Sequence, residues 1–187
     1  MAEDRIKKAF DFIDRAQFMP EKVRHLAGFD QPVPIGYGQT ISQPYTVAKM
    51  LEWLGVQPGD KVLDIGSGSG WTTALLAHLA GPNGRVFAVE RIPELVEFGQ
   101  QNCAKLGIKN AQFSTAGEEL GWPQKAPFDR ILISAAAIEF PEKIMAQLKP
   151  NGKLVIPVMH DILEITKTPK KGRDVRKHPG FIFVPLL

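Results

Sequence analysis

A glycine-rich turn at residues 62–71 carries the clearest chemical signal in the chain. The segment reads Val-Leu-Asp-Ile-Gly-Ser-Gly-Ser-Gly-Trp, so a short apolar run passes through an acid to three alternating glycines before a helical pattern begins. This order predicts a strand that enters a turn at a helix N-terminus, where a ligand can approach bare backbone N–H groups without interference from Cβ atoms. A turn that only allows close packing of strand and helix is the alternative.

The spacing and charge of this turn indicate which ligand it binds. Gly66, Gly68 and Gly70 follow a G-x-G-x-G pattern, whereas dinucleotide-binding turns follow G-x-G-x-x-G. Asp64 places a negative charge where a pyrophosphate would lie. Glu90 follows Gly70 by 20 residues, where an acid that accepts hydrogen bonds from both ribose hydroxyls is expected. A cationic ligand with a ribose, such as S-adenosylmethionine, is therefore predicted between Asp64 and Glu90.

The elements that must position this turn alternate between strands and helices. Strand-like runs lie at 61–65, 85–90, 111–115, 130–134 and 153–158, and helical patterns lie at 71–80, 93–106 and 139–148. This alternation predicts an α/β fold with a doubly wound, Rossmann-like, mostly parallel sheet. Two further runs, 162–167 and 181–186, are expected to pair antiparallel at its C-terminal edge, which gives about seven strands. The carboxyl ends of the strands should bring together Asp64–Ser67, Glu90, Ala116–Glu118 and Ser134.

The residues before the sheet are interpreted as a cap over it. Apolar stripes in 4–18 and 43–55 indicate helical packing faces. The stretch 29–44 contains several prolines and glycines, so we expect an ordered loop without regular structure, a kind of loop that is often functional. The prediction is one domain over 1–187, with a cap and substrate loop at 1–60, a cofactor-binding core at 61–158 and a strand pair at 159–187.

Composition narrows the function further. The net charge of the 187 residues is +3, and much of the excess comes from six basic residues near the C-terminus, which are interpreted as a solvated loop rather than a nucleic-acid surface. They are Lys167, Lys170, Lys171, Arg173, Arg176 and Lys177. The absence of a long apolar run and of a signal-like start, with Cys103 as the single cysteine, favours a cytoplasmic protein without a membrane partner. The four histidines show no metal-ligand spacing, so no metal site is predicted.

The end of the fourth predicted strand indicates the type of methyl acceptor. It reads Ser134-Ala135-Ala136-Ala137, which offers small side chains and no carboxamide to hold an amine. A carboxylate acceptor is already ionised and nucleophilic at neutral pH. Its methylation requires orientation and exclusion of water rather than a strong general base.

Residues 35–44, Ile-Gly-Tyr-Gly-Gln-Thr-Ile-Ser-Gln-Pro, closely resemble the signature loop of the protein-L-isoaspartate O-methyltransferases, a family of class I S-adenosylmethionine-dependent methyltransferases. Further segments resemble that family in the same order, so that the likeness spans about residues 19–187. They are Gly121-Trp122, Ala126–Asp129, Gln147–Gly152, Leu154–Val158 and Phe183–Leu186.

The resemblance implies methyl transfer from S-adenosylmethionine to the free carboxylate of L-isoaspartyl residues in damaged proteins and peptides. The resulting ester cyclises to a succinimide, which allows repair. The resemblance also assigns Ser42 to the active site, where its hydroxyl could orient the acceptor. The alternative is that Ser42 is an ordinary loop serine. The substrate loop would comprise Ile35, Gly36, Tyr37, Gln39, Thr40 and Ile41. The cofactor contacts would be Asp64, Gly66, Ser67, Gly68, Glu90, Arg91, Gly117 and Glu118.

Two segments depart from the family pattern. Ala116-Gly117-Glu118 stands where the family usually has Gly-Asp-Gly, so Glu118 is the candidate replacement for the adenine-binding acid. The glycine-rich loop that usually follows Ile156-Pro157-Val158 is absent. Two other functions therefore stay open, a methyltransferase acting on another carboxylate or a small molecule, and a cofactor-binding homologue without catalysis. We expect a monomer whose partners are isoaspartyl proteins and peptides.

Overall fold

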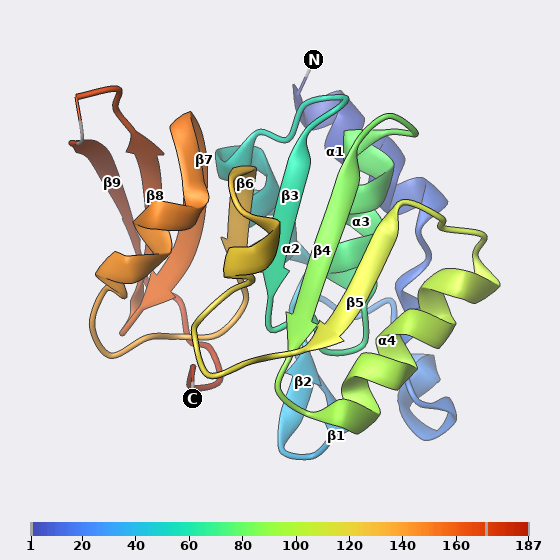
Figure 1. The fold of residues 1–187 in the computed structure, drawn as a ribbon. Coiled ribbons are helices and arrows are strands. Elements are labelled where there is room, and N and C mark those ends of the chain that lie inside the picture. The colour runs from blue at the N-terminus through green and yellow to red at the C-terminus, as the bar shows by residue number, and fades with distance from the viewer. Residues whose placement is uncertain (1, 171, 187) are drawn as a thin grey trace.

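A seven-stranded sheet forms the centre of the molecule (Figure 1). The computed structural model describes residues 2–170 and 172–186, so Met1, Lys171 of the predicted basic loop and Leu187 lie outside the described residues. The strands of the sheet are β3 (Lys61–Ile65), β4 (Arg85–Glu90), β5 (Ala111–Thr115), β6 (Phe128–Ile133), β7 (Leu148–Val158), β8 (Asp161–Lys167) and β9 (Arg173–Pro179). They lie side by side in the order β5-β4-β3-β6-β7-β8-β9.

The pairing of these strands confirms the predicted α/β sheet. Neighbouring strands from β5 to β7 are parallel, whereas β8 pairs antiparallel with both β7 and β9 at the C-terminal edge. The chain runs outward from β3 through β4 to β5, and then places β6 on the other side of β3. The strand order therefore reverses between β3 and β6, which is where open α/β sheets bind ligands beyond the carboxyl ends of their strands.

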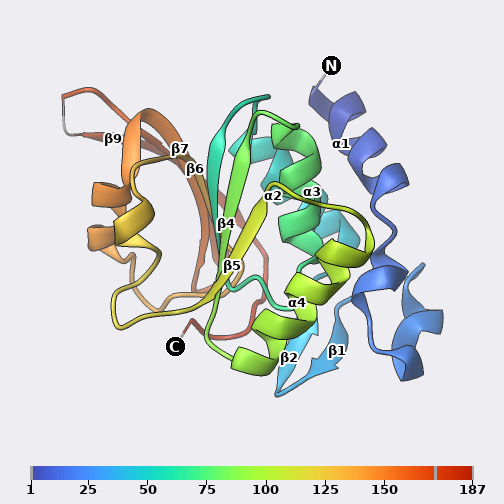
Figure 2. The ribbon, with the colours of Figure 1, turned by 45° about the vertical axis from the view of Figure 1, so that its right-hand side comes forward.

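The two faces of the sheet carry different layers (Figure 2). One face is covered by α1 (Ala2–Phe12), α2 (Pro44–Leu54), α3 (Trp71–Ala80) and α4 (Pro93–Lys105), and the other by loops and the short 3-10 helices η3 (Pro123–Lys125) and η4 (Glu142–Gln147). Alternate strand residues fill the two layers: Val62 and Val86 pack with the α-helices, and Leu63 and Phe87 pack in the opposite core. In the described part of the chain, no helix has both the length and the apolar character that a membrane span requires.

The helix predicted over 139–148 is wrong, because this segment forms only the 3-10 helix η4. Pro141 immediately precedes η4, and Leu148 already pairs with Phe128 as the first residue of β7. Six residues remain between these two fixed points, and such short segments favour 3-10 over α-helical geometry.

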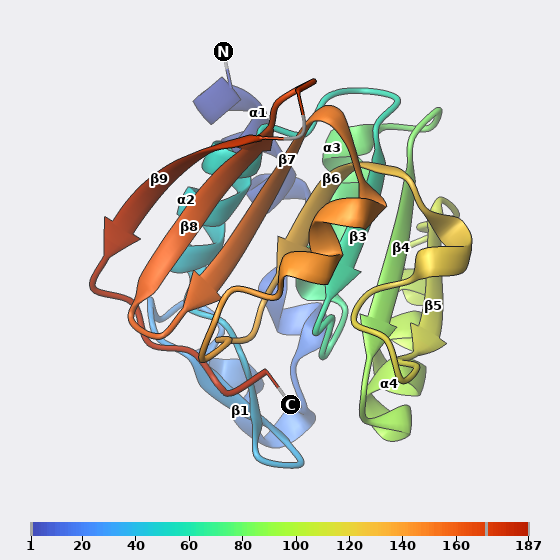
Figure 3. The ribbon, with the colours of Figure 1, turned by 60° about the vertical axis from the view of Figure 1, so that its left-hand side comes forward.

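The C-terminal prediction is wrong in its second strand. The edge strand β9 is the basic segment 173–179, which was interpreted as a solvated loop, whereas the apolar run 181–186 is not a strand of the sheet. After β9 the chain turns back across the carboxyl ends of the strands (Figure 3), and Pro185 forms an isolated parallel bridge with Ala136. Most of β9 is exposed on an edge, so its stability does not require an apolar pattern.

The N-terminal cap contains more regular structure than expected. The helical stripe of 4–18 divides into α1 and a 3-10 helix, η1 (Arg15–Phe18), and a second 3-10 helix, η2 (Glu21–Leu26), follows. Residues 29–44, predicted to lack regular structure, contain the antiparallel hairpin of β1 (Val33–Gly36) and β2 (Gln39–Ile41). Its turn residues Tyr37 and Gly38 both have positive φ, 56° and 72°, which matches the twist of a two-residue hairpin turn. The hairpin lies beyond the carboxyl ends of the central strands (Figure 1).

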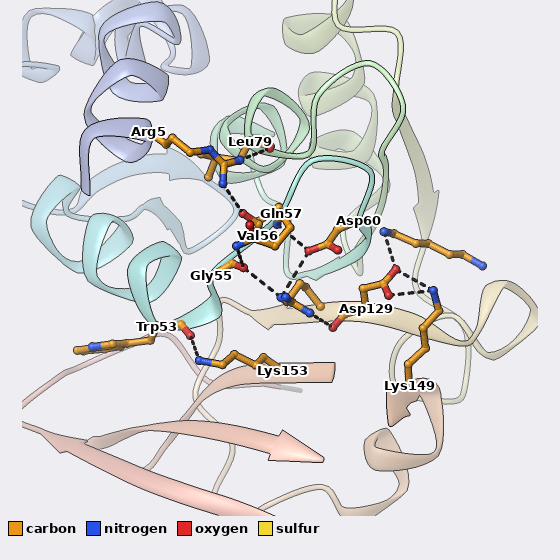
Figure 4. Close-up of polar contacts among 12 residues, drawn as sticks. Arg5, Trp53, Gly55, Val56, Gln57, Asp60, Leu79, Asp129, Lys149 and Lys153 are labelled. Carbon is orange, nitrogen blue, oxygen red and sulfur yellow. Dashed lines mark hydrogen bonds and ion pairs between the residues drawn. The ribbon is translucent and has the colours of Figure 1, made fainter. Parts of the chain in front are cut away.

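A polar cluster ties the opposite, amino ends of the strands together (Figure 4). Asp129 of β6 accepts hydrogen bonds from the backbone N–H of Lys61 and from Nζ of Lys149, each at 2.9 Å. Arg130 Nε donates to the carbonyl of Gly55, at the end of α2 (3.3 Å). These contacts join the amino ends of β3, β6 and β7 to each other and to the carboxyl end of α2.

Candidate active site

A cavity of about 360 Å³ opens at the carboxyl ends of the central strands, within the size range of small-molecule sites. It brings together the end of β2, the glycine turn, the end of β4, the segment 116–121, the end of β6 and the C-terminal tail. The residues predicted from sequence that line it are Gln39, Thr40, Ile41, Ser42, Gly66, Ser67, Gly68, Glu90, Arg91, Gly117 and Glu118.

Four other predicted site residues do not line the cavity. Ile35 is buried behind the glycine turn, and its Cδ1 lies 3.4 Å from where a Cβ on Gly68 would be. Gly36 and Tyr37 lie at the hairpin turn, where Tyr37 is 60% exposed. Asp64 is fully buried beneath the turn. A role of these four residues in binding therefore stays a prediction.

The glycine turn is held by an unusually close approach of two helices. Gly70 has a φ of +84°, and a Cβ there would lie 2.8 Å from the carbonyl oxygen of Gly99 in α4. The neighbouring Asn102 of α4 donates from Nδ2 to the carbonyl of Ser69 (3.1 Å). Only glycine at position 70 permits both the conformation and this contact. Gly99 and Asn102 were not found from the sequence, because they lie within an ordinary helical pattern.

The expectation of bare N–H groups at the turn is wrong for Gly66, Ser67 and Gly68, and the N–H of Gly70 also donates within the turn, to the carbonyl of Ser67 (2.8 Å). The N–H groups of Gly66 and Ser67 donate to the carbonyl of Val89 in β4, at 2.9 and 3.2 Å. The N–H of Gly68 donates to Oε2 of Glu90 (3.0 Å). A phosphate would need such N–H groups as donors, so their commitment to β4 disfavours a phosphate here and is compatible with a cationic ligand.

The carboxylate of Glu90 has capacity for a ligand beyond the bonds it already makes. It is 8% exposed at the end of β4, and its oxygens accept from the N–H groups of Gly68 and Ile92, each at 3.0 Å. A carboxylate has about four acceptor positions, so two remain. That number matches the two hydroxyls of a ribose, which is the role predicted for Glu90.

Buried polar atoms beneath the turn indicate the charge of the ligand. Thr73 Oγ1 donates to Oδ2 of Asp64 (2.6 Å), whereas Oδ1 of Asp64 and Oγ of Ser67 are buried with no hydrogen-bond partner among the described residues. Burial raises the pKa of Asp64 to about 7, an effect that the Thr73 hydrogen bond opposes and the charge of Glu90 reinforces. A cation bound above the turn would favour the ionised form of Asp64, so these residues fit a positively charged cofactor.

The loop at residues 120–122 is held by the side-chain amide of Gln147. Gln147 Oε1 accepts from the N–H of Trp122 (2.9 Å), and its Nε2 donates to the carbonyl of Leu120 (2.7 Å). The intervening Gly121 lies so close that a Cβ there would be 2.6 Å from Gln147 Oε1. Gln147 therefore holds Leu120 and Gly121, which line the cavity, in a fixed position.

Segments far apart in the sequence build another part of the cavity wall. Ser42, which directly follows the hairpin, lines the same cavity as Ser134 and Ala135, which follow β6. The tail residues 184–186 also line it, and the N–H groups of Ala136 and Leu186 bond across the bridge, each at 2.8 Å. The role of the tail was missed, because its apolar pattern favoured a strand.

Comparison with known proteins agrees with this arrangement. The sequence model of the family "Protein-L-isoaspartate(D-aspartate) O-methyltransferase (PCMT)" matches residues 1–187. The protein-L-isoaspartate O-methyltransferase of Methanopyrus kandleri is 44% identical over 98% of this chain and 84% of its own length. That of Pyrococcus horikoshii is 40% identical over 98% of this chain and 85% of its own length.

Solved structures show the same likeness. A Plasmodium falciparum beta-aspartate methyltransferase (PCMT), crystallised with S-adenosyl-L-homocysteine, matches with a TM-score of 0.86 and 30% identity over 98% of this chain and 90% of that chain. A second structure, named protein-L-isoaspartate O-methyltransferase, has a TM-score of 0.86 and 27% identity over 98% of this chain and 61% of that chain.

We predict that ionisation of Asp64 destabilises the protein without cofactor as the pH rises. A carboxyl whose pKa is raised on folding contributes stability below its unfolded pKa of 3.8, and this contribution is lost as the pH rises to the folded value of about 7. Asp64→Asn removes this titration and keeps an acceptor for Thr73. Its free energy of unfolding in urea should exceed that of the unchanged protein at about pH 8 by roughly 1–4 kcal/mol, since each pKa unit corresponds to about 1.4 kcal/mol.

Asp129→Asn is the matched control. The pKa of Asp129 is lowered, because the hydrogen bonds from Lys149 and Lys61 outweigh the effect of burial, so it titrates below the range tested. This variant should be destabilised by a similar amount at every pH between about 5 and 8. If the free energies of unfolding of Asp64→Asn and of the unchanged protein depend on pH in the same way over this range, the raised pKa of Asp64 is contradicted.

Proposed function

The chain belongs to the protein-L-isoaspartate(D-aspartate) O-methyltransferase family, and we propose that its cavity methylates the free carboxylate of L-isoaspartyl residues in damaged proteins and peptides. It is an enzyme of a family that uses S-adenosylmethionine, and the reaction is the first step of protein repair. The observation that carries the proposed site is that Ser42 and Glu90 line one cavity at the point where the strand order reverses.

The proposed cofactor position follows from the contacts of the turn. When bound, S-adenosylmethionine supplies a methyl group on a positively charged sulfur. Glu90 would accept hydrogen bonds from the ribose hydroxyls through its two remaining acceptor positions, while it continues to hold the N–H of Gly68. Asp64 would supply a negative charge beneath the cation without touching it, because the side chain is fully buried. Ser67 Oγ, which is buried and unpartnered among the described residues, would find its hydrogen bond here.

The base of the cofactor is proposed to lie against the segment 116–121. Gly117 gives room beside the strand end, and Glu118 would take the place of the acid that the family usually carries one residue earlier. Arg91 directly follows Glu90 and also lines the cavity, and it would contact the same end of the cofactor.

Ser42 is proposed to orient the acceptor. A carboxylate needs no proton removed before it attacks, so a hydroxyl that donates one hydrogen bond to it is sufficient to fix its direction. The small residues Ser134 and Ala135 line the same cavity as Ser42 and would leave space for the isoaspartyl side chain. The hairpin residues Gln39–Ile41 and the tail 184–186 would cover the reacting groups and keep water from them.

We also propose the domain organisation, oligomeric state, location and partners of the protein, and the use of its basic residues supports part of this proposal. The chain would work as one domain, as a monomer in the cytoplasm, with isoaspartyl proteins as partners and no nucleic acid or membrane. Part of its basic surplus is already used internally: Arg173 forms a bidentate pair with Glu142, and Lys167 Nζ donates to the carbonyls of Met145 and Leu148. These contacts reduce the free positive charge that a nucleic-acid surface would need.

We predict that the enzyme methylates an L-isoaspartyl peptide and leaves the matching normal aspartyl peptide unmodified. The experiment measures transfer of a radiolabelled methyl group to each peptide, with calorimetric titration of S-adenosylhomocysteine as the measure of cofactor binding. Methylation of both peptides, or of a different carboxylate instead, would indicate another substrate. Cofactor binding without turnover on either peptide would indicate a homologue that has lost catalysis.

Ser42→Ala should lower kcat about tenfold or more, because loss of one hydrogen bond to a charged group corresponds to roughly 1.5–3 kcal/mol. The dissociation constant of S-adenosylhomocysteine should stay within about twofold, since Ser42 is assigned to the acceptor rather than the cofactor. Ser114→Ala, which removes a hydroxyl in β5 outside the cavity, is the control and should leave both quantities unchanged. A variant with normal kcat and weakened cofactor binding would refute this placement of Ser42.

A further inference from the structure

The side chain of Arg15 is buried beside the site, and among the described residues its hydrogen bonds all go to backbone carbonyls. The residue as a whole is 6% exposed, and it lies at the start of η1 in the N-terminal cap. Its Nη1 and Nη2 atoms donate to five carbonyl oxygens from two separate segments. These are the carbonyls of Ala27 (3.1 Å), Phe29 (3.2 Å), Gln31 (2.7 Å), Ile41 (3.4 Å) and Ser42 (3.1 Å).

The same guanidinium also contacts the start of α3. Its central carbon lies 5.4 Å from the centroid of the Trp71 ring, within the range of a cation–π interaction. Trp71 follows the glycine turn directly and lines the cavity. Arg15 therefore joins the segment 27–31, the end of the hairpin at Ile41–Ser42, and the base of the cofactor turn.

The charge of Arg15 is not matched by a direct ion pair. Burial lowers the pKa of Arg15, and the negative charge of Asp30 acts in the opposite direction. Within residues 2–170 and 172–186, no carboxylate lies within ion-pair distance of its guanidinium. Asp30 instead accepts from the N–H of Tyr45 (2.8 Å) and from Nε2 of Gln43 (2.9 Å) at the start of α2. Burying a cation without a carboxylate partner costs free energy of folding. Stability alone therefore does not account for Arg15, which indicates that it positions the segments whose carbonyls it binds.

We propose that Arg15 is a positioning residue that holds Ser42 and the end of the substrate hairpin against the cofactor turn. This inference rests on the proposed role of Ser42 in orienting the acceptor. Without Arg15, the carbonyls of Ile41 and Ser42 lose their charged donor, and the segment 39–42 is no longer tied to Trp71. The cofactor turn stays in place, because Glu90 and Gly99 hold it independently.

Arg5 provides a matched control for this role. It also donates to backbone carbonyls, from a partly buried guanidinium, with Nη1 to Val56 (3.1 Å) and Nη2 to Leu79 (2.7 Å), as Figure 4 shows. These contacts lie before β3 and at the end of α3, at the opposite end of both elements from the cavity. Loss of Arg5 therefore removes the same type of bond without touching the substrate hairpin.

The test compares Arg15→Met, Arg15→Lys and Arg5→Met, each assayed well below its melting temperature. Arg15→Met should lower kcat about tenfold or more while the dissociation constant of S-adenosylhomocysteine changes less than about threefold. Arg5→Met should lose thermal stability and keep kcat. Arg15→Lys keeps the charge but not the planar fork, so it should restore part of kcat. Equal kcat values for Arg15→Met and Arg5→Met, or a loss confined to cofactor affinity, would overturn the inference.

Hydrogen exchange gives a readout that does not depend on activity. The backbone amides of residues 39–43 should exchange faster in Arg15→Met than in the unchanged protein and in Arg5→Met. Unchanged exchange in this segment would overturn the inference even if the enzyme methylates a different acceptor. If Arg15→Met does not fold, Arg15→Lys decides: both kcat and exchange at unchanged-protein values would overturn it. Failure of the unchanged protein to methylate any isoaspartyl peptide would count against the proposed function alone.

Discussion

The attachment of the glycine turn to strand β4 is the constraint on which the rest of the site depends. Val89 and Glu90 accept the N–H groups of Gly66, Ser67 and Gly68, so the turn has a single position relative to the strand. The same bonds decide which ligands the turn favours. The bonded N–H groups are no longer available as donors to a phosphate, whereas a cation is compatible with the buried carboxyl of Asp64 beneath the turn. One carboxylate, that of Glu90, thus shapes the turn and still has acceptor positions for a ribose.

The two halves of the cavity are stabilised in different ways. The half proposed for the cofactor lies on parallel strands and on the Gly70–Gly99 contact between two helices, so its geometry follows from the sheet. The half proposed for the acceptor is assembled from the hairpin before the sheet and the tail after it, which have no place in that sheet. A buried guanidinium from the cap and a short bridge to Ala136 hold these parts in position.

The sequence predicts those parts of the structure where local pattern and tertiary role coincide. The bounds of β3 and β4 agree with their apolar runs, since strands covered on both faces need continuous apolar residues. The bounds of the edge strand β5 also agree with the prediction, although none of its residues is fully buried. The basic strand β9 was missed because an exposed edge strand needs no such pattern. The apolar run 181–186 gave a wrong prediction because its residues 184–186 line the cavity instead of pairing in the sheet. The hairpin was missed because Tyr37 and Gly38, counted as part of a stretch of breakers, supply the turn it needs. Arg15 and Asn102 give no local signal, since their partners are distant backbone carbonyls.

A crystal structure of the protein with S-adenosylhomocysteine tests the central idea most directly. If the crevice beside the glycine turn binds the nucleoside, both ribose hydroxyls will lie within hydrogen-bond distance of the Glu90 carboxylate. The sulfur will face Ser42, with the base against residues 116–121. Density for the ligand with its ribose remote from Glu90, or with its sulfur directed away from Ser42, would contradict the assignment of both residues.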